Sequence, residues 1–522
     1  MRLLLCLVCL LLGTRVVHGQ TAVEAWTQRY HGPANRSDLV QAMVVDSMGN
    51  VIVTGMSAAS EVYPNNRDYA TIKYSGTGVP LWTNRYDGPI SDDDIPAAIA
   101  VDANGNVFVT GTSLGFGNSR RDSATVKYSA NGLPLWTNRY HGPANGSDYA
   151  TALAVYTNGD VIVTGYSPGT GTAADYATIK YSSMGIPLWT NRYNGPANSN
   201  DTPAAVALDR DGNAFVAGSS SDGTNGDYLT IKYSPTGLPL WINRFNGPGH
   251  KGDFVRDVAV DASGNLLVTG EASDGTNSNY ATIKYSPDGI PLWTNYYGGP
   301  AGDWDAPVAI AVDSLGNVLV TGTSTRDGVN YDYDCATIKY SGAGVPLWTN
   351  RYDADTGDGA YDLAIDASDS VIVTGSSGPF DYSSDYATIK YSAAGVPLWA
   401  VRYTARENKF AWSVAVAIGP TGDVFVTGNL SNGNESDFVT IKYAEVWAII
   451  LNVNSFTNGT LNAAFTNTPG ATFTLMGTTH LSSDPGAWTV FGAVSEIAPG
   501  QFSFTNTSAA TEPRVFYRVR SP

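Results

Sequence analysis

Aspartates recur at three regular positions along this chain, and carboxylates repeated in this way could bind cations or transfer protons. The first set comprises Asp38, Asp94, Asp148, Asp201, Asp253, Asp305 and Asp358. The second comprises Asp68, Asp122, Asp175, Asp227, Asp334, Asp385 and Asp437. The third comprises Asp46, Asp102, Asp209, Asp261, Asp313 and Asp366. A ring of the first set could hold a metal ion, but a residue needed in every repeat more often caps a turn or pairs with a neighbouring repeat, and we expect the structural role.

A lysine recurs with the same spacing and accounts for eight of the ten lysines in the sequence. The eight are Lys73, Lys127, Lys180, Lys232, Lys284, Lys339, Lys390 and Lys442. A cation at a fixed distance from repeated carboxylates predicts ion pairs with one aspartate set, or stacking along a tyrosine. The alternative is a basic belt that binds a ligand.

Signatures of several enzyme classes are missing from the sequence. His31, His141, His250 and His480 do not have the His-x-x-x-His spacing of a zinc site, and there is no Gly-x-Ser-x-Gly segment. Eight recurrent tryptophans resemble those of quinoprotein dehydrogenases in geometry only, because those enzymes use adjacent cysteines and a calcium site. Acidic pairs occur at Asp92–Asp94 and at Asp303 with Asp305, but a glycosidase pair is defined by a distance across the sugar. We expect no cofactor and no resident metal.

The repeated residues belong to a unit of about 52 residues that occurs eight times between Trp26 and Tyr443. Its tryptophan recurs as Trp26, Trp82, Trp136, Trp189, Trp241, Trp293, Trp348 and Trp399. A period of this size is typical of solenoids, propellers or arrays. The second unit contains four β-type runs, which we name strands A to D: residues 98–101, 106–110, 123–128 and 135–140.

The connections between these strands differ in kind. The A–B turn reads Asp-x-x-Gly-Asn, as in Asp102–Asn106, and the C–D turn reads Ser-x-x-Gly, as in Ser234–Gly237. Both patterns predict tight type I turns. The B–C and D–A connections vary in length and composition. Because the strands alternate in direction, the tight turns lie on one face and the variable connections on the other.

Four antiparallel strands per unit predict a β-propeller, with a β-solenoid or a string of small domains as alternatives. The array begins with a D strand, Val23–Tyr30, and ends with a C strand, Phe438–Tyr443. A closed ring in which the first strand completes the last blade uses every strand once and leaves no free inner edge. We therefore predict an all-β, eight-bladed propeller, or seven or fewer blades if one unit is degenerate.

These units resemble the SBBP-type β-propeller repeat family, found largely in secreted bacterial proteins. The resemblance rests on the segments Asp175–Tyr181, Pro187–Trp189 and Ala259–Gly270, whose patterns recur through roughly 420 residues. The family name suggests seven blades, whereas eight units are counted here. The resemblance implies a propeller fold and a scaffold role, with no single activity to transfer. The ending Phe516–Pro522 resembles carboxy-terminal modules of secreted proteins from verrucomicrobial-type bacteria.

Three segments follow from this organisation. Residues 1–20 have a basic start and the apolar run Leu3–Leu12, which predicts a signal peptide and export. Residues 21–446 form the propeller. The period stops there, and residues 447–522 contain alternating runs separated by Pro, Gly and Asn, which predict a small β-sandwich. Cys6 and Cys9 would leave with the signal peptide, so that Cys335 has no partner for a disulfide bond.

The net charge of −17 argues against nucleic acid as a partner and against anionic membrane surfaces. No segment after the signal peptide is long and apolar enough to insert into a membrane. We expect a monomer located outside the cell or at its surface, with a polysaccharide or a protein as partner.

Two functions remain open: a binding scaffold that uses the variable face, or a secreted carbohydrate-active enzyme with acidic residues on the same face. A site must be local, so its residues should be absent from the other units. Such candidates mix aromatic and basic side chains, which favours binding. The candidate ligand-binding residues are Trp304, Tyr331, Tyr333, Phe380, Arg121, Arg406, Phe410 and Trp412, with no catalytic residue assigned.

Overall fold

The structure is a computed structural model, and the residues that it describes form strands and loops in two compact units. The described residues are 20–34, 36–59, 66–115, 120–326, 332–354, 357–378, 384–404, 410–431, 433, 435–447, 452–457, 460–466, 474–478, 489–498, 501–506 and 516–520. One unit spans Ala22–Ala444, and the other contains the residues from Glu445 onward. No helix that could cross a membrane is found in the described part of the chain.

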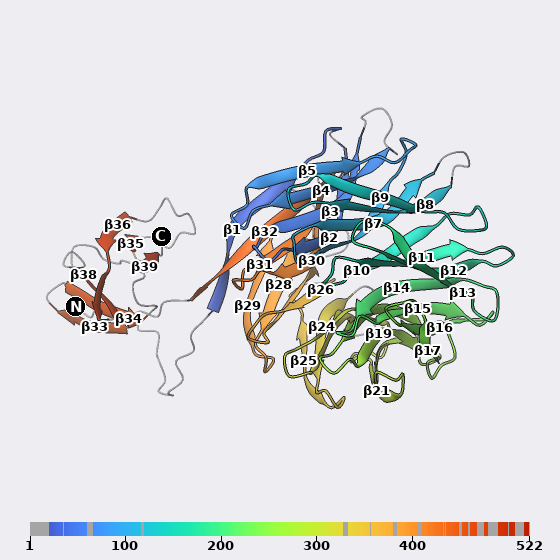
Figure 1. Cartoon of the computed structure of the whole chain (residues 1–522). Helices are drawn as coiled ribbons and strands as arrows, with labels where there is room; N and C mark the ends of the chain where they lie inside the picture. Colours follow the sequence, from blue (N-terminus) through green and yellow to red (C-terminus); the bar gives the residue numbers. More distant parts are fainter. Residues whose placement is uncertain are drawn as a thin grey trace. The chain divides into compact units, whose positions relative to one another are not determined.

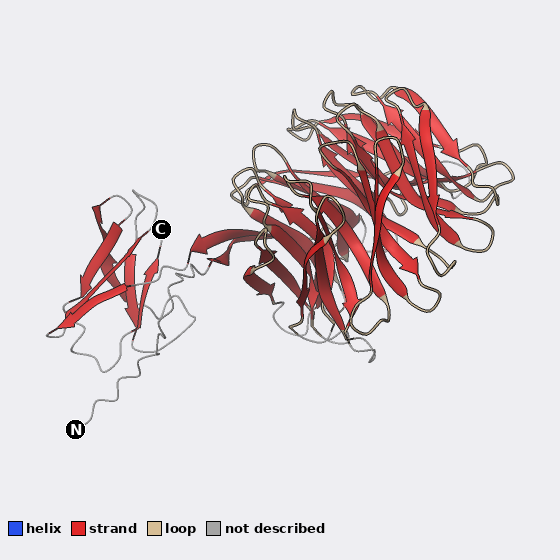
Figure 2. Ribbon diagram, turned by 90° about the horizontal axis from the view of Figure 1, so that it is seen from below, coloured by secondary structure: helices blue, strands red, loops and turns tan. Residues whose placement is uncertain are grey.

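The larger unit is a ring of eight four-stranded antiparallel sheets, which confirms the predicted eight-bladed propeller (Figures 1 and 2). Blade one contains β2 (Asp38–Val45), β3 (Val51–Ala58), β4 (Arg67–Tyr74) and β5 (Pro80–Tyr86). Blade two contains β6 (Ile95–Val101), β7 (Val107–Leu114), β8 (Arg121–Tyr128) and β9 (Pro134–Tyr140). Blade three contains β10 (Tyr149–Val155), β11 (Val161–Pro168), β12 (Ala174–Tyr181) and β13 (Pro187–Tyr193). Blade four contains β14 (Asp201–Leu208), β15 (Ala214–Ser221), β16 (Gly226–Tyr233) and β17 (Pro239–Phe245).

The second half of the ring repeats this order. Blade five contains β18 (Phe254–Val260), β19 (Leu266–Ser273), β20 (Ser278–Tyr285) and β21 (Pro291–Tyr297). Blade six contains β22 (Asp305–Val312), β23 (Val318–Thr325), β24 (Tyr333–Tyr340) and β25 (Pro346–Tyr352). Blade seven contains β26 (Gly359–Ile365), β27 (Val371–Ser377), β28 (Asp385–Tyr391) and β29 (Pro397–Tyr403). Blade eight contains β30 (Phe410–Ile418), β31 (Val424–Ser431), β32 (Ser436–Trp447) and the first strand, β1 (Gln20–Tyr30).

Closure follows the predicted scheme. The strand order in blade eight is β1-β32-β31-β30, so the amino-terminal strand is its outer strand, and Figure 1 shows β1 beside β32. Each A strand contacts the A strand of the next blade, and β2 contacts β30 to close the inner ring. Every inner strand therefore has a neighbour on both sides.

The tight turns form as their residues predict. Gly105 donates its N–H to the carbonyl of Asp102 at 2.9 Å, and Gly237 does the same to Ser234 at 2.9 Å. Both glycines have φ near +80°, which residues with a side chain rarely adopt. The connections on this face are therefore fixed by local sequence, while the opposite face is free to vary.

The strands of the middle of each blade form the core. The B strand is buried along almost its whole length, as in β3, because sheets cover both of its faces. Apolar B-strand residues of one blade pack with those of the next, as Val51 and Val53 do with Phe425 of blade eight. The core thus runs continuously from blade to blade.

The tryptophans lie between blades. Trp82 of blade one packs against Gly132 of blade two and donates its indole N–H to the carbonyl of Ala130 at 3.1 Å. Its ring centroid lies 6.0 Å from that of Tyr128. A Cβ on Gly132 would meet this indole within 3 Å, so the turn glycine is also required for blade packing.

The smaller unit contains two sheets. The first has the order β33 (Asn452–Thr457), β34 (Thr460–Thr466), β38 (Gln501–Asn506) and β37 (Ser495–Ala498). The second has the order β36 (Thr489–Ala493), β35 (Thr474–Thr478) and β39 (Phe516–Arg520). The alternating runs expected here, residues 471–476, 488–494, 502–505 and 515–519, overlap β35, β36, β38 and β39. The sequence analysis did not anticipate β33, β34 and β37, and face-to-face packing of the two sheets stays a prediction.

Candidate binding site on the variable face

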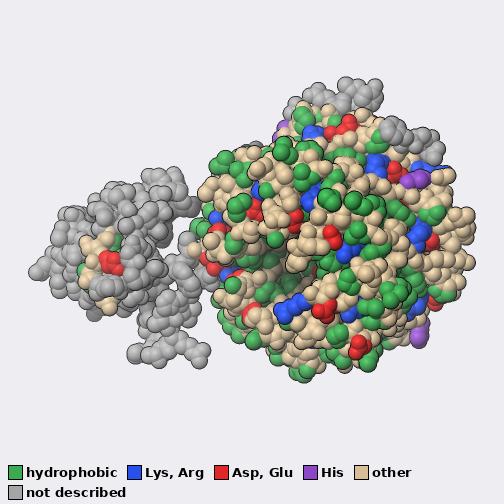
Figure 3. Space-filling model, viewed as in Figure 1, with side chains coloured by type: hydrophobic (Ala, Val, Ile, Leu, Met, Phe, Trp, Pro, Cys, Tyr) green, Lys and Arg blue, Asp and Glu red, His purple; other side chains and the backbone are tan. Residues whose placement is uncertain are grey.

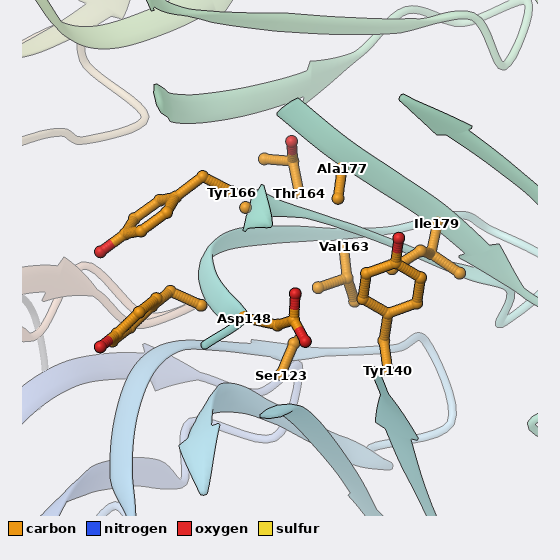
Figure 4. A pocket seen from close by; sticks show the side chains of 10 residues that line it. Ser123, Tyr140, Asp148, Val163, Thr164, Tyr166, Ala177 and Ile179 are labelled. Atoms are coloured by element: carbon orange, nitrogen blue, oxygen red, sulfur yellow. The ribbon is translucent and has the colours of Figure 1, made fainter. Parts of the chain in front are cut away.

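The first aspartate set caps the D–A connection and is not an open ring around the axis. Asp148 is fully buried and accepts the backbone N–H of Gly142 at 2.8 Å. Figure 4 shows its carboxylate among Ser123, Tyr140 and Val163. Burial raises the pKa of this carboxyl above its ordinary value. A glycine six residues earlier makes the same contact with Asp38, Asp94, Asp201, Asp253 and Asp305, and Ala354 donates its N–H to Asp358.

The second set is paired with an arginine on the D strand. Arg85 donates to Asp68 at 3.0 Å, to the Ser57 hydroxyl at 2.6 Å and to the Tyr30 hydroxyl of blade eight at 3.3 Å. The network therefore links two blades. Equivalent Asp–Arg pairs are Asp122–Arg139, Asp175–Arg192, Asp227–Arg244, Asp334–Arg351 and Asp385–Arg402.

The third set pairs with the repeated lysine, which confirms that prediction. Lys73 lies 2.8 Å from Asp46, with both side chains buried, and donates to the Ala130 carbonyl of the next blade at 3.2 Å. Burial alone would raise the pKa of Asp46, but hydrogen bonds from Lys73 and Asn50 hold it below its ordinary value. The other pairs are Lys127–Asp102, Lys180–Asp160, Lys232–Asp209, Lys284–Asp261, Lys339–Asp313, Lys390–Asp366 and Lys442–Asp423.

The third aspartate set predicted from the sequence did not include two of these acids, Asp160 and Asp423. In the third and eighth repeats the carboxylate moves to the last position of the A–B turn, where Asp160 and Asp423 replace the usual asparagine. Lys180 and Lys442 still reach them, at 3.7 and 2.9 Å. The ion pair is thus kept in all eight blades, so these lysines do not form a free basic belt.

The predicted binding residues do not gather in one place. Tyr331, Phe380 and Arg406 lie outside the described residues. Arg121 begins β8 and donates to the backbone carbonyl of Asp93 at 2.7 Å. Phe410 and Trp412 lie at the start of β30, where Trp412 is opposite Asn429.

Trp304 and Tyr333 do meet, on the edge of blade six. Their ring centroids are 5.7 Å apart and nearly perpendicular. The Trp304 indole N–H donates to Glu271 of blade five at 3.2 Å, and its carbonyl accepts a hydrogen bond from the Thr325 hydroxyl. Trp304 remains 40% exposed. The backbone is thus fixed while much of the indole stays open to solvent.

Trp304 borders an open pocket of about 410 Å³ on the variable face. The pocket is lined by Lys251, Gly252, Phe254, Glu271, Ser273, Thr276, Asn277, Ser278, Asp303 and Trp304. These residues come from the ends of β18, β19 and β20 in blade five and from the connections beside them, including the connection to blade six. Phe254 is 49% exposed, so two aromatic side chains present open surface beside polar groups.

Hydrogen bonds make the pocket wall rigid. Arg256, Ser278 and Trp304 all donate to Glu271. The backbone N–H groups of Thr276 and Asn277 donate to Asp274, and these bonds lower the pKa of that carboxyl. The Asn277 amide donates to the carbonyl of Gly302, so the two loops are fastened together.

Phe254 and Glu271 were missed because the sequence search was confined to connections between strands. They lie directly opposite each other in β18 and β19. The same pair of positions holds Leu39 with Met56 in blade one and Tyr149 with Tyr166 in blade three. Comparison of strand positions across repeats would have found this variable pair.

The same comparison identifies two acids on the inner strands. Asp257 and Asp362 occupy a position that is alanine in the other six blades. Asp257 accepts N–H groups from Val258 and, in the next blade, from Ile310. Burial raises the pKa of Asp257 to about 6 and that of Asp362 to about 7.

Comparison with known proteins supports the repeat assignment. Residues 87–117 match the model of the SBBP family, described as a beta-propeller repeat. An uncharacterized WD repeat-containing protein of Acanthamoeba polyphaga mimivirus is 24% identical over 426 residues, which cover 65% of this chain. The matched region is 29% of the length of that viral protein.

Solved structures with low sequence identity were also matched. Sqt1 from Chaetomium thermophilum has a TM-score of 0.50 and 10% identity, with 81% of this chain and 99% of Sqt1 covered. A structure titled as the eukaryotic initiation factor has a TM-score of 0.40 and 9% identity, over 79% of this chain and 98% of its own. The ring of eight blades and the match to the repeat model make the chain a β-propeller repeat protein.

Proposed function

We propose that this chain is an exported binding scaffold whose ligand site is the pocket between Phe254 and Trp304. The observation that carries the proposal is the pairing of two half-exposed aromatic side chains with a rigid polar wall. Soluble proteins rarely hold large aromatic surfaces open on a fixed frame unless they contact a partner. Export is proposed from the amino-terminal segment alone.

The side chains that line the pocket favour a carbohydrate ligand, either a polysaccharide or a glycan of a cell surface. A protein is the other possible ligand. Sugar rings have apolar faces that stack on aromatic side chains, and hydroxyl groups that hydrogen-bond with Asn277, Ser278 and Lys251. Glu271 is held by Arg256 and by Trp304, so it suits a fixed acceptor better than a proton carrier. Charged side chains of both signs are interspersed over the face of the propeller drawn in Figure 3.

A glycan array with the full chain tests this proposal. We expect binding to a defined set of glycans, reduced about 30-fold or more in Trp304→Ala and in Phe254→Ala, since loss of a central aromatic contact commonly costs about 2 kcal/mol. Tyr296→Ala is the matched control, because Tyr296 is similarly exposed but lies outside the pocket lining. All three variants should melt close to the wild-type temperature.

Three outcomes would overturn the proposal. The first is no binding to any glycan or protein probe, and the second is equal binding by the Trp304 and Phe254 variants. The third is turnover of a bound glycan that Glu271→Gln abolishes, which would replace a binding role by an enzymatic one.

A further inference from the structure

The boundary between blades one and two holds three carboxylates at close range. Asp68 belongs to β4, Asp87 follows β5, and Asp94 precedes β6. One carboxylate oxygen of each lies within 4.8 Å of those of the other two. Asp68 is 4% exposed and Asp94 is 0% exposed, whereas Asp87 is open to solvent. The cluster can therefore be reached from one side only.

The partners of these carboxylates leave oxygen atoms unused. Asp68 accepts hydrogen bonds from Arg85 on Oδ2, and Asp94 accepts the Gly88 N–H on Oδ2. The Oδ1 atoms of Asp68 and Asp94 are buried and have no hydrogen bond of acceptable geometry, although the Ser113 hydroxyl lies near Asp94. Three negative charges thus face one arginine. Burial and, secondarily, the charges of Asp68 and Asp87 raise the pKa of Asp94 to about 6.

At two other blade boundaries a histidine occupies the place of Asp87, whereas the Oδ1 atoms of Asp175, Asp227 and Asp334 are buried without a hydrogen bond, as Oδ1 of Asp68 is. His31 takes the position of Asp87 beside blade eight, and its Nδ1 lies 2.6 Å from Oδ1 of Asp437. His141 does the same with Asp122 at 3.0 Å. The equivalent of the unused oxygen of Asp68 is therefore bonded to an imidazole at those boundaries. At the boundary of blades one and two, a third carboxylate takes the place of that imidazole.

One other blade boundary has an aspartate at the position of Asp87, and there an arginine balances its charge. Asp353, between blades six and seven, lies 2.9 Å from the guanidinium of Arg326. Asp87 accepts a hydrogen bond from the Ser91 hydroxyl at 3.3 Å, and no basic side chain of the described residues pairs with it. The missing positive charge at Asp68, Asp87 and Asp94 has to come from solution.

We propose that Asp68, Asp87 and Asp94 form a binding site for a divalent cation, with Ca²⁺ as the preferred ion. All three ligand groups offer hard oxygen atoms, and the set contains no nitrogen or sulfur donor that would favour zinc. The open side next to Asp87 has room for water ligands, which calcium accepts in irregular geometry. With three protein ligands we expect a dissociation constant of about 10⁻⁴ to 10⁻³ M, the range of extracellular calcium modules.

The bound ion would join β4 of blade one to the connection that enters blade two. Calcium titration of the full chain, after treatment with a chelator, tests this directly by calorimetry and by thermal melting. We expect saturable heat and a melting temperature that rises with CaCl₂ up to about 10 mM, with a weaker response to Mg²⁺. Asp87→Asn should weaken calcium binding at least tenfold without loss of the fold, because Asp87 is exposed.

Two further variants test whether the calcium response depends on Asp87 itself. Asp353→Asn removes the compensated acid at the matching position and should leave the calcium response unchanged. Asp87→His restores the arrangement of His31 with Asp437, so it should raise the melting temperature in chelator and abolish the calcium response. A wild-type protein without heat or stabilisation would overturn the proposal, as would an unchanged response in Asp87→Asn.

Discussion

At the scale of single residues, the acids of the inner strands are the most unusual groups in the ring. Asp362 accepts N–H groups from Leu363 at 2.8 Å and from Val416 of the next blade at 2.8 Å. Burial outweighs these hydrogen bonds and raises its pKa to about 7, and the charge of Asp257 raises it further. The inner surface of the ring therefore contains two carboxyls that gain or lose a proton near neutral pH.

Asp362 should make the stability of the ring depend on pH. Its pKa is higher in the folded protein than in the unfolded chain, so its contribution is complete below about pH 4 and is lost as the pH rises through about 7. From pH 5 to pH 8 the expected loss is at most about 3 kcal/mol. Asp362→Ala, which restores the residue of the other repeats, should remove most of this loss in urea unfolding at the two pH values.

An exposed aspartate such as Asp211 provides the control for this experiment. Asp211→Ala should follow the wild-type dependence on pH. If the curves of wild type and Asp362→Ala run parallel, the carboxyl of Asp362 has an ordinary pKa.

Sequence reasoning reached Trp304 because an aromatic side chain in a variable connection breaks the repeat. It failed at Phe254, Glu271 and Asp257, which occupy regular strand positions whose neighbours depend on how blades stack. The pairing of each Asp with its Lys or Arg needed the structure as well, because the spacing alone fits more than one partner.

At the scale of elements, each blade is fastened to the next through the outer half of its sheet. Blade five departs from this pattern, with Asn279 and Tyr296 at the places of the usual Asp and Arg. Both members of the ion pair are replaced together, which avoids a buried charge without a partner. The two positions should therefore be energetically coupled.

A double-mutant cycle measures that coupling. Asn279→Asp alone should destabilise by about 1–3 kcal/mol, because it places a carboxylate next to Tyr296 without a counter-charge. Asn279→Asp combined with Tyr296→Arg restores the pair of the other blades and should recover at least 1 kcal/mol of that loss. Urea unfolding at pH 8 provides the values. Additive effects of the two substitutions would show that positions 279 and 296 are not coupled.

The strand order and the tight turns were predictable because each depends on local residues. Strand lengths were less predictable. Strand A of blade two was expected at residues 98–101, yet β6 begins at Ile95. Pro96 lies on the inner edge strand of its sheet, where a proline is tolerated because an edge position need not donate to a ladder. The bulge between Pro96 and Ala98 also breaks the regular alternation.

At the scale of the whole molecule, the ring is closed by a strand from the opposite end of the propeller segment. Deleting residues 20–31 removes the outer strand of blade eight together with Trp26, whose indole donates to Gly76 of blade one. We expect a lower melting temperature and a loss of stability throughout the ring, since blades one and eight lose the outer part of their shared interface.

Removal of residues 448–522 is the control, and we expect that truncation to melt like the full chain. Differential scanning calorimetry of both truncations provides the comparison. A protein without residues 20–31 that melts like the full chain would show that closure contributes little.

The lysine and tryptophan contacts between blades run in one direction. In blades one to six the lysine and the tryptophan donate to a carbonyl in the C–D turn of the following blade, and Lys442 and Trp26 of blade eight both reach Gly76 of blade one. Blade eight takes its C and D strands from opposite ends of the propeller segment, so it has no C–D turn of this kind. Each of the other repeats thus carries one matching acceptor for the donors of the preceding blade. A tandem duplication of a whole repeat would add a blade in which each donor still has an acceptor. The number of blades is then limited by the angle between inner strands and not by the hydrogen bonds between blades. A repeat inserted in this way would also bring a second copy of its variable connections, free to acquire a different ligand while the fastening residues stay the same.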